Sequence, residues 1–125
     1  MTDKLTPVRL AISRERIVAY AEISNDFNPI HVDPEFARQS PMGGIIAHGT
    51  MSLNLIWQAL EQTFGGPDGR YYITEIRFRV PVREDDVVEA GGERISSDAF
   101  QVWVRNQDGV TVIDGVATIH AQEPA

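Results

Sequence analysis

In the second half of the chain, apolar and polar residues alternate in the way that is typical of strands. Alternation over residues 76–82 predicts a half-buried strand, and residues 87–95 predict another, with a bulge at Gly91-Gly92. A third strand is expected over residues 100–105. After the turn Asn106-Gln107-Asp108-Gly109, residues 110–121 are apolar on both faces, which predicts a central strand.

The first half instead carries apolar residues at helical spacing. Ser13 is a good N-cap for a helix over residues 14–24, after a short strand over residues 8–12. The long, strongly buried helix follows His48-Gly49-Thr50 and is closed by Gly65-Gly66-Pro67. Its apolar positions are Met51, Leu55, Ile56, Ala59, Leu60 and Phe64.

One buried helix followed by an antiparallel meander predicts an α+β fold in which the sheet wraps around the helix. Such a sheet leaves an open edge strand, which oligomers commonly cover, so a homodimer is the expected minimum. The Asp26–His31 segment is expected to be a loop, and Pro34 to begin a short helical turn through Arg38. Residues 40–44 either line the entrance of a site or only connect two elements.

Length and composition place the chain among ordinary globular proteins. Its 125 residues predict a single domain over residues 1–125, and no segment approaches the about 20 apolar residues of a membrane span. The first twelve residues lack the apolar core of a signal peptide, so a cytoplasmic location is expected. The absence of cysteine excludes disulfides, thiolate metal sites and a cysteine nucleophile.

The formal net charge of −7 argues against nucleic acid as a partner. An anionic small-molecule substrate would therefore need local positive charge. Candidate phosphate-binding arginines are Arg77, Arg79 and Arg83 near one strand, with Arg9 and Arg38 elsewhere. The alternative is that they are solvated surface residues.

The chemistry of the chain is concentrated between Tyr20 and Ala37. Asp26, Asn28, Pro29 and His31 fall within six residues. Pro29 disfavours helical dihedrals at the residue before it, so the chain turns there. A carboxylate and an imidazole that converge on one water can activate it and handle its proton. Asp and Asn before Pro are also ordinary turn chemistry, which is the alternative interpretation.

A second stretch, IIAHGTMS, completes the candidate site. Gly49 has no side chain and precedes a long helix, so its N–H is accessible at the positive end of the helix dipole. These are the requirements for an oxyanion donor, although a glycine at a helix start can also serve packing alone. His48 is interpreted as a structural or supporting residue, and Met51 as core that could line an acyl tunnel.

These two stretches resemble the signature of the MaoC-like (R)-specific enoyl-thioester hydratases, also described as 3-hydroxyacyl-thioester dehydratases. The matching positions are Tyr20, Ile23, Ser24, Asp26, Asn28, Pro29, Ile30, His31, Ala37, His48, Gly49 and Thr50. One position departs from the family, because Asn25 stands where a glycine is usual. Asparagine is among the few residues that tolerate positive φ, so the site is expected to be intact.

The resemblance implies a hotdog fold and a hydro-lyase without a cofactor, whose substrate is an acyl-CoA or acyl-carrier-protein thioester. Asp26 and His31 would activate a water that adds to C3 of a trans-2-enoyl thioester, giving an (R)-3-hydroxyacyl thioester or, in reverse, dehydration. The N–H of Gly49 would stabilise the enolate oxygen. Asn28 and Ser24 would support the loop.

Three other classes are open at this point. A hotdog thioesterase would use a carboxylate on the central helix, but Glu61 is too near the far end of that helix. The chain could also be an inactive acyl-binding subunit, or an active chain that needs a partner. A metal enzyme would use Asp26, His31 and His48, although their spacing matches no ligand pattern.

Overall fold

The computed structural model describes residues 2–65 and 70–120, which form an antiparallel five-stranded sheet and four helices. The strand order is β1-β3-β4-β5-β2, so β1 and β2 are the edges. The elements in chain order are β1 (Val8–Ala11), α1 (Arg14–Ser24), α2 (Pro29–Val32), α3 (Pro34–Gln39), α4 (Gly49–Phe64), β2 (Tyr71–Phe78), β3 (Val87–Ser96), β4 (Ala99–Arg105) and β5 (Thr111–Ile119). The predicted α+β architecture is confirmed.

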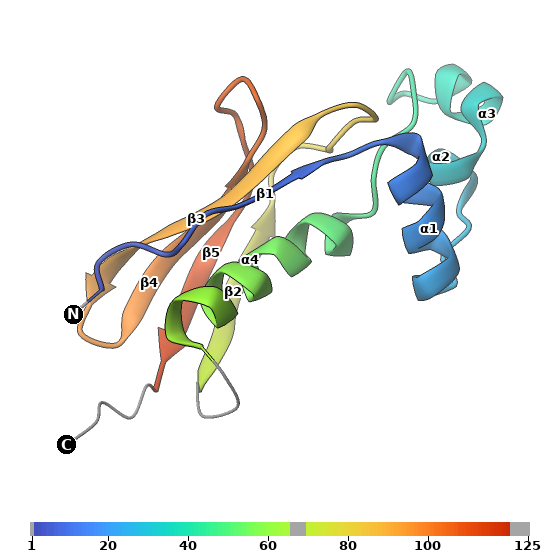
Figure 1. The fold of residues 1–125 in the computed structure, drawn as a ribbon. Coiled ribbons are helices and arrows are strands. Elements are labelled where there is room, and N and C mark those ends of the chain that lie inside the picture. Colours follow the sequence, from blue (N-terminus) through green and yellow to red (C-terminus); the bar gives the residue numbers. More distant parts are fainter. Residues whose placement is uncertain (1, 66–69, 121–125) are drawn as a thin grey trace.

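Helix α4 lies across one face of the sheet, while α1, α2 and α3 gather beyond its N-terminal end (Figure 1). It packs against β1, β3 and β4. The buried positions of the helix are Met51, Ser52, Leu55, Ile56, Ala59 and Leu60. Facing them are wholly buried strand residues, with Phe100 the largest. Burying this apolar stripe holds the helix on the sheet.

Helix α1 begins and ends where the sequence predicts. Ser13 Oγ accepts a hydrogen bond from Arg16 N at 3.2 Å, and Asn25 ends the helix with φ 56°, in the left-handed region. A bidentate ion pair between Arg14 and Glu84 joins the helix to the turn before β3. Arg14 Nε lies 2.7 Å from Glu84 Oε2. The hydrogen bonds from Arg14 to Glu84 raise the pKa of the arginine above its ordinary value.

The segment after α1 is more ordered than the expected loop. Pro29 occupies the first turn of helix α2, and Asn28 caps that helix by accepting from Ile30 N at 3.2 Å. Asp33 then caps α3 by accepting from the N–H groups of Glu35 and Phe36 at 3.1 Å each. The expectation of a loop up to His31 was wrong because the proline and its cap start a helical turn.

Two expectations about the sheet also need correction. Strand β2 runs from Tyr71 to Phe78, earlier than the expected 76–82. The expected bulge is wrong, because Gly91 and Gly92 pair regularly with β4, and the register shifts only at Arg94/Ser96. These glycines serve close packing: a Cβ on Gly91 would lie 2.9 Å from Trp103 Nε1. The turn predicted after Gly65 and the last residue of the strand predicted over 110–121 lie outside the described residues.

Candidate active site

His31 lies on α2 with its ring oriented by the main chain. Its Nδ1 is 2.7 Å from the carbonyl oxygen of Ile46, and its side chain is 12% exposed. A carbonyl can only accept, so Nδ1 carries the proton of the neutral ring. Nε2 is then the acceptor, which makes it the basic atom of the site.

Asp26 stands just beyond α1 and faces that basic atom. Its Oδ2 is 4.0 Å from His31 Nε2, and its Oδ1 accepts from Asn28 N at 3.2 Å. A separation of 4.0 Å is too long for a direct hydrogen bond. One water to the side of the line between the two atoms can contact both. The carboxylate is half exposed, so water can reach it.

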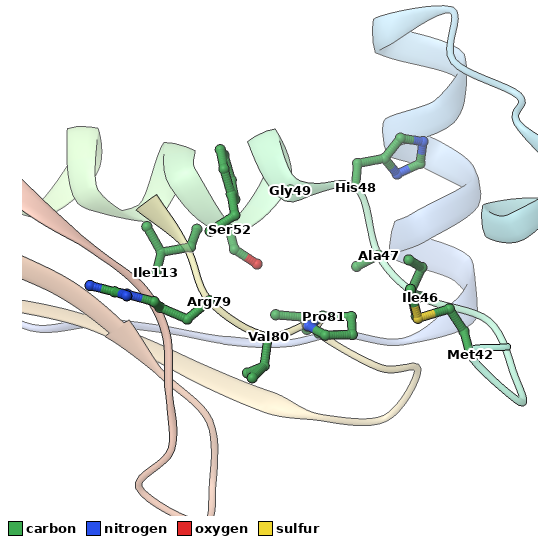
Figure 2. A pocket seen from close by; sticks show the side chains of 12 residues that line it. Met42, Ile46, Ala47, His48, Gly49, Ser52, Arg79, Val80, Pro81 and Ile113 are labelled. Atoms are coloured by element: carbon green, nitrogen blue, oxygen red, sulfur yellow. The ribbon is translucent and has the colours of Figure 1, made fainter. Parts of the chain in front are cut away.

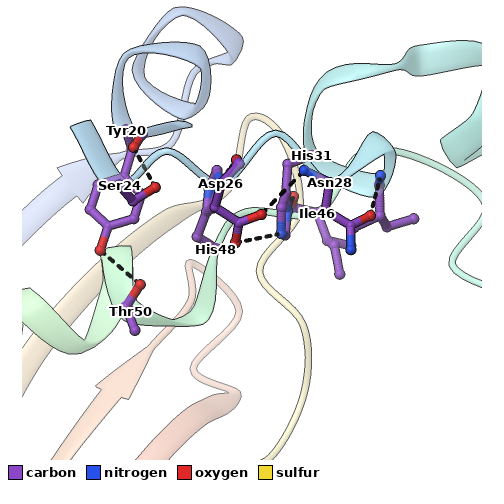
Figure 3. Close-up of polar contacts among 9 residues, drawn as sticks. Tyr20, Ser24, Asp26, Asn28, His31, Ile46, His48 and Thr50 are labelled. Atoms are coloured by element: carbon purple, nitrogen blue, oxygen red, sulfur yellow. Dashed lines mark hydrogen bonds and ion pairs between the residues drawn. The ribbon is translucent and has the colours of Figure 1, made fainter. Parts of the chain in front are cut away.

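His48 connects the two sequence stretches and is itself buried, with 3% exposed. Its Nε2 lies 2.9 Å from the main-chain oxygen of Asp26, and its ring is stacked on that of His31, 3.9 Å away between centroids (Figure 3). Tyr20 packs edge-on against His48 and hydrogen-bonds Thr50 at 2.7 Å. His48 therefore contacts both Asp26 and His31, as a supporting residue would.

Asp26, His31 and His48 each place one potential ligand atom within 4.8 Å of the others, which is close enough to consider a shared metal ion. Zinc needs lone pairs that converge at about 2 Å from the ion. Imidazole lone pairs lie in the ring plane, and the two rings are stacked with only 24° between their planes. Their lone pairs do not converge, so these residues as arranged do not fit a tetrahedral ion.

Gly49 begins α4 directly after His48, whose ring stacks on that of His31. The N–H of a first helical residue has no acceptor within its own helix, and within residues 2–65 and 70–120 no backbone carbonyl outside the helix accepts from Gly49 N. Its missing side chain also matters for packing, because a Cβ would lie 2.8 Å from Cε1 of Phe78. Both interpretations of this glycine, as donor and as packing residue, agree with the geometry.

A cavity of about 330 Å³ opens next to Gly49 (Figure 2). Its lining residues are Met42, Ile46, Ala47, His48, Gly49, Ser52, Phe78, Arg79, Val80, Pro81, Val82 and Ile113. Most of these side chains are apolar, as expected of a site for a hydrocarbon group. Met42 brings the 40–44 segment to the cavity, and Arg83 holds that segment by donating to the Met42 carbonyl.

Other predicted site residues have clear structural contacts. Ser24 Oγ donates to the carbonyl of Tyr20 at 2.8 Å, so its hydroxyl is turned back onto α1. Asn28 caps α2, in agreement with a loop-supporting role. Met51 is a core residue and does not line the cavity beside Gly49.

All five candidate phosphate-binding arginines already contact acceptors of the chain. Arg79 pairs with Asp114 at 3.1 Å and lines the cavity, and Arg77 pairs with Glu75 at 2.8 Å. The other pairs are Arg83 with the Met42 carbonyl, Arg9 with Glu89, and Arg38 with Glu35. An anionic ligand would therefore have to compete with these partners.

Sequence reasoning gave Ser52 no role, although the structure places it in the cavity lining. One signal was present: Ser52 is a polar residue within the buried stripe of an otherwise apolar helix face. Phe78 was assigned only to a strand, and no local pattern predicts that its ring covers Gly49.

The sheet with its single long helix, and the paired carboxylate and imidazole beside that helix, define a hotdog protein with a candidate site for acid–base chemistry. Residues 2–116 match the family described as MaoC like domain. The chain belongs to this family.

Relatives of known name agree with this assignment. The chain is 42% identical over 78 residues to a 3-hydroxybutyryl-CoA dehydratase of Methylorubrum extorquens, covering 62% of this chain and half of that enzyme. It is 33% identical to a mitochondrial 3-hydroxyacyl-[acyl-carrier-protein] dehydratase of Arabidopsis thaliana, covering 93% of this chain and 74% of that protein.

Solved structures show the same fold. The unliganded R-hydratase PhaJ1 of Pseudomonas aeruginosa superposes with a TM-score of 0.85 at 29% identity, covering 99% of this chain and 83% of that one. The (R)-hydratase of Aeromonas caviae involved in PHA biosynthesis gives 0.77 at 26% identity, covering 94% and 96%. Within the described residues, no helix has the length and apolar character needed to cross a membrane.

Proposed function

We propose that this protein is a hydro-lyase that hydrates trans-2-enoyl thioesters to (R)-3-hydroxyacyl thioesters and catalyses the reverse dehydration. The observation that carries the proposal is the pair of Asp26 Oδ2 and His31 Nε2, 4.0 Å apart. Asp26 and His31 do not line the apolar cavity themselves, but Ile46 and His48, which contact His31, line it together with Gly49 at the N-terminus of α4. Relatives named 3-hydroxybutyryl-CoA dehydratase and (R)-specific enoyl-CoA hydratase support the choice of reaction.

In the proposed hydration, a water between Asp26 and His31 loses a proton to the pair as its oxygen bonds to C3. The electrons of the C2=C3 bond move toward the thioester carbonyl and give an enolate, whose oxygen accepts from the N–H of Gly49. The pair then returns a proton to C2, so atoms and charge balance. His31 Nε2 is the atom suited to take the first proton, since Nδ1 is bonded to a carbonyl.

The acyl carrier is proposed to be coenzyme A, and no cofactor is expected. The name of the Methylorubrum relative supports CoA, whereas that of the Arabidopsis relative indicates acyl carrier protein, which is the alternative carrier. A homodimer is proposed because the edge strand β2 exposes large apolar side chains, among them Tyr72 and Phe78.

The test is loss of the conjugated thioester absorbance of crotonyl-CoA. Asp26→Asn and His31→Ala should each lower turnover by about 10²–10⁴, the usual contribution of a general acid or base. Asp108→Asn is the matched control, because Asp108 is an exposed carboxylate in the turn before β5 and should leave turnover unchanged.

Wild-type turnover in folded Asp26→Asn protein would remove Asp26 from this scheme. Full activity after exhaustive treatment with EDTA is also expected, because the three potential ligands do not converge on one ion. Loss of activity in EDTA with recovery on adding zinc would favour the metal enzyme instead.

A further inference from the structure

Ser52 lies in the first turn of α4, and its side chain is fully buried. Its Oγ has no hydrogen-bond partner in the part of the chain that the structure describes. Within residues 2–65 and 70–120, only His48 Nδ1 shares this condition of a buried, unpartnered side-chain polar atom. Buried hydroxyls are normally paired because leaving one unpaired costs free energy, so this one calls for an explanation.

The usual partner of a helical hydroxyl is the carbonyl four residues earlier. Thr63, in the same helix, makes this contact by donating to the carbonyl of Ala59 at 2.6 Å. Ser52 makes no such bond to the carbonyl of His48. Instead its oxygen points from α4 into the cavity, toward the space framed by Ala47, Pro81 and Ile113 (Figure 2).

Ser52 and Gly49 lie in the same turn at the start of α4. Residues three apart on a helix lie on one face, about 5–6 Å between Cβ positions. Helical side chains also tilt toward the N-terminus, so the Ser52 side chain leans over the turn that Gly49 begins. Both residues line the same cavity. A ligand oxygen bound at this end of the cavity would therefore be flanked by Gly49 and Ser52.

We propose that Ser52 is a catalytic residue that donates a second hydrogen bond to the thioester oxygen, beside the N–H of Gly49. This inference rests on the proposed hydratase function. A single donor would leave one side of the developing enolate oxygen without a partner, and the Ser52 hydroxyl supplies it. The cavity lining is largely apolar, and a bound acyl group would displace water from it; hydrogen bonds to a developing charge are stronger in such surroundings.

The first experiment compares Ser52→Ala with Ser52→Thr on crotonyl-CoA. Removal of one oxyanion donor should lower kcat about 10²-fold and leave KM within a few-fold, because the bond strengthens in the transition state. The threonine variant keeps the hydroxyl and should recover most of the loss. Asn54→Ala, an exposed change on the same helix, is the control and should keep wild-type kcat.

A purely structural role would make Ser52→Ala less stable, with a lower melting temperature. We expect a melting temperature that is unchanged or higher, because the substitution removes an unpaired buried hydroxyl and adds a better helix former. A lower kcat in an equally stable protein supports the proposal. A wild-type kcat, or a change confined to KM, overturns the assignment to Ser52.

The second readout is spectroscopic and needs no turnover. Bound acetoacetyl-CoA forms an enolate with its own near-ultraviolet absorbance, and donors to the thioester oxygen increase the enolate fraction. Wild type should show more of this absorbance than Ser52→Ala, while both bind saturated butyryl-CoA equally well. Equal enolate signals would overturn the inference.

The two proposals fail in different ways. If wild type hydrates crotonyl-CoA, Asp26→Asn does not, and Ser52→Ala matches wild type, only the role of Ser52 is wrong. If wild type is as inactive as Asp26→Asn on every enoyl-CoA and enoyl carrier protein offered, the hydratase function itself is wrong.

Discussion

The ring of His31 is held by one hydrogen bond and one stacked neighbour, and together these decide its chemistry. The carbonyl of Ile46 fixes the proton on Nδ1, and the stacked His48 ring fixes the plane in which Nε2 points. Both contacts come from the segment just before α4. The base of the proposed reaction is therefore oriented before any substrate binds, which lowers the cost of reaching the transition state.

Asn25 offers a residue-scale prediction, because its φ of 56° lies in the left-handed region. Asn25→Gly, which restores the usual family residue, should keep turnover and change the free energy of unfolding by less than about 1 kcal/mol. Asn25→Val should lower that free energy by about 1–2 kcal/mol, since a β-branched residue resists this conformation. Urea unfolding checks both. A valine variant as stable as wild type would contradict the explanation.

Single-residue signals were readable from the sequence where they act locally. Ser13 as a cap, Asn25 as a stop signal and Pro34 in the first turn of α3 were all expected and are found. The contact of His48 with the Asp26 carbonyl joins residues 22 positions apart, and no local pattern encodes it. The pairing of Asp26 with His31 was expected because only four residues separate them and one of these, Pro29, turns the chain back.

At the scale of elements, Gly115 of β5 lies tightly against the backbone of β2. A Cβ at this position would lie 2.0 Å from the carbonyl oxygen of Glu75, next to the register shift between Ile73 and Glu75 in β2. The contact is with the backbone, so a small side-chain movement cannot relieve it. The backbone path of β2 at its register shift therefore leaves room only for a glycine at position 115 of β5.

Gly115→Ala should consequently lower the free energy of unfolding by about 2–3 kcal/mol, the cost of overpacking against a rigid neighbour. Gly44→Ala is the matched control. Nothing lies within 4 Å of its added Cβ, so the change should stay within about 0.5 kcal/mol. Urea midpoints measure both. Equal midpoints for Gly115→Ala and wild type would show that the two strands can separate without cost.

The type of each element followed from apolar periodicity, but the function of individual glycines did not. Gly91-Gly92 suggested a bulge, whereas the pair makes room for Trp103 and Leu5 within a regular ladder. Glycine in a strand indicates either a bulge or close approach of another group. Which of the two applies depends on side chains of β4 and of the N-terminal segment. The sequence around Gly91-Gly92 does not specify where those side chains lie.

At the scale of the whole molecule, the two edges of the sheet differ. Edge strand β2 carries Tyr72 and Phe78, which are 54% and 57% exposed, whereas β1 exposes Arg9. An exposed apolar edge favours pairing with another strand. We therefore expect two copies of the chain to associate through β2, close to the cavity that Phe78 helps to line.

Tyr72→Lys should weaken this association at least about tenfold, because it places a charge at an apolar edge. Ile95→Lys is the control, since Ile95 is 58% exposed but lies at the end of β3. Light scattering coupled to size-exclusion chromatography over a dilution series measures both. A wild-type monomer, or a Tyr72→Lys dimer of unchanged affinity, would place the interface elsewhere or remove it.

The anchoring of the site through main-chain atoms has an evolutionary consequence. His48 holds the carbonyl of Asp26 and His31 holds the carbonyl of Ile46, so neither contact depends on the side chain of residue 26 or 46. A gene duplicate could exchange the carboxylate of Asp26 for an inert group and still fold around the same cavity. If the proposed function holds, a pseudoenzyme with the same scaffold is thus one substitution away, and selection can act on catalysis and scaffold separately.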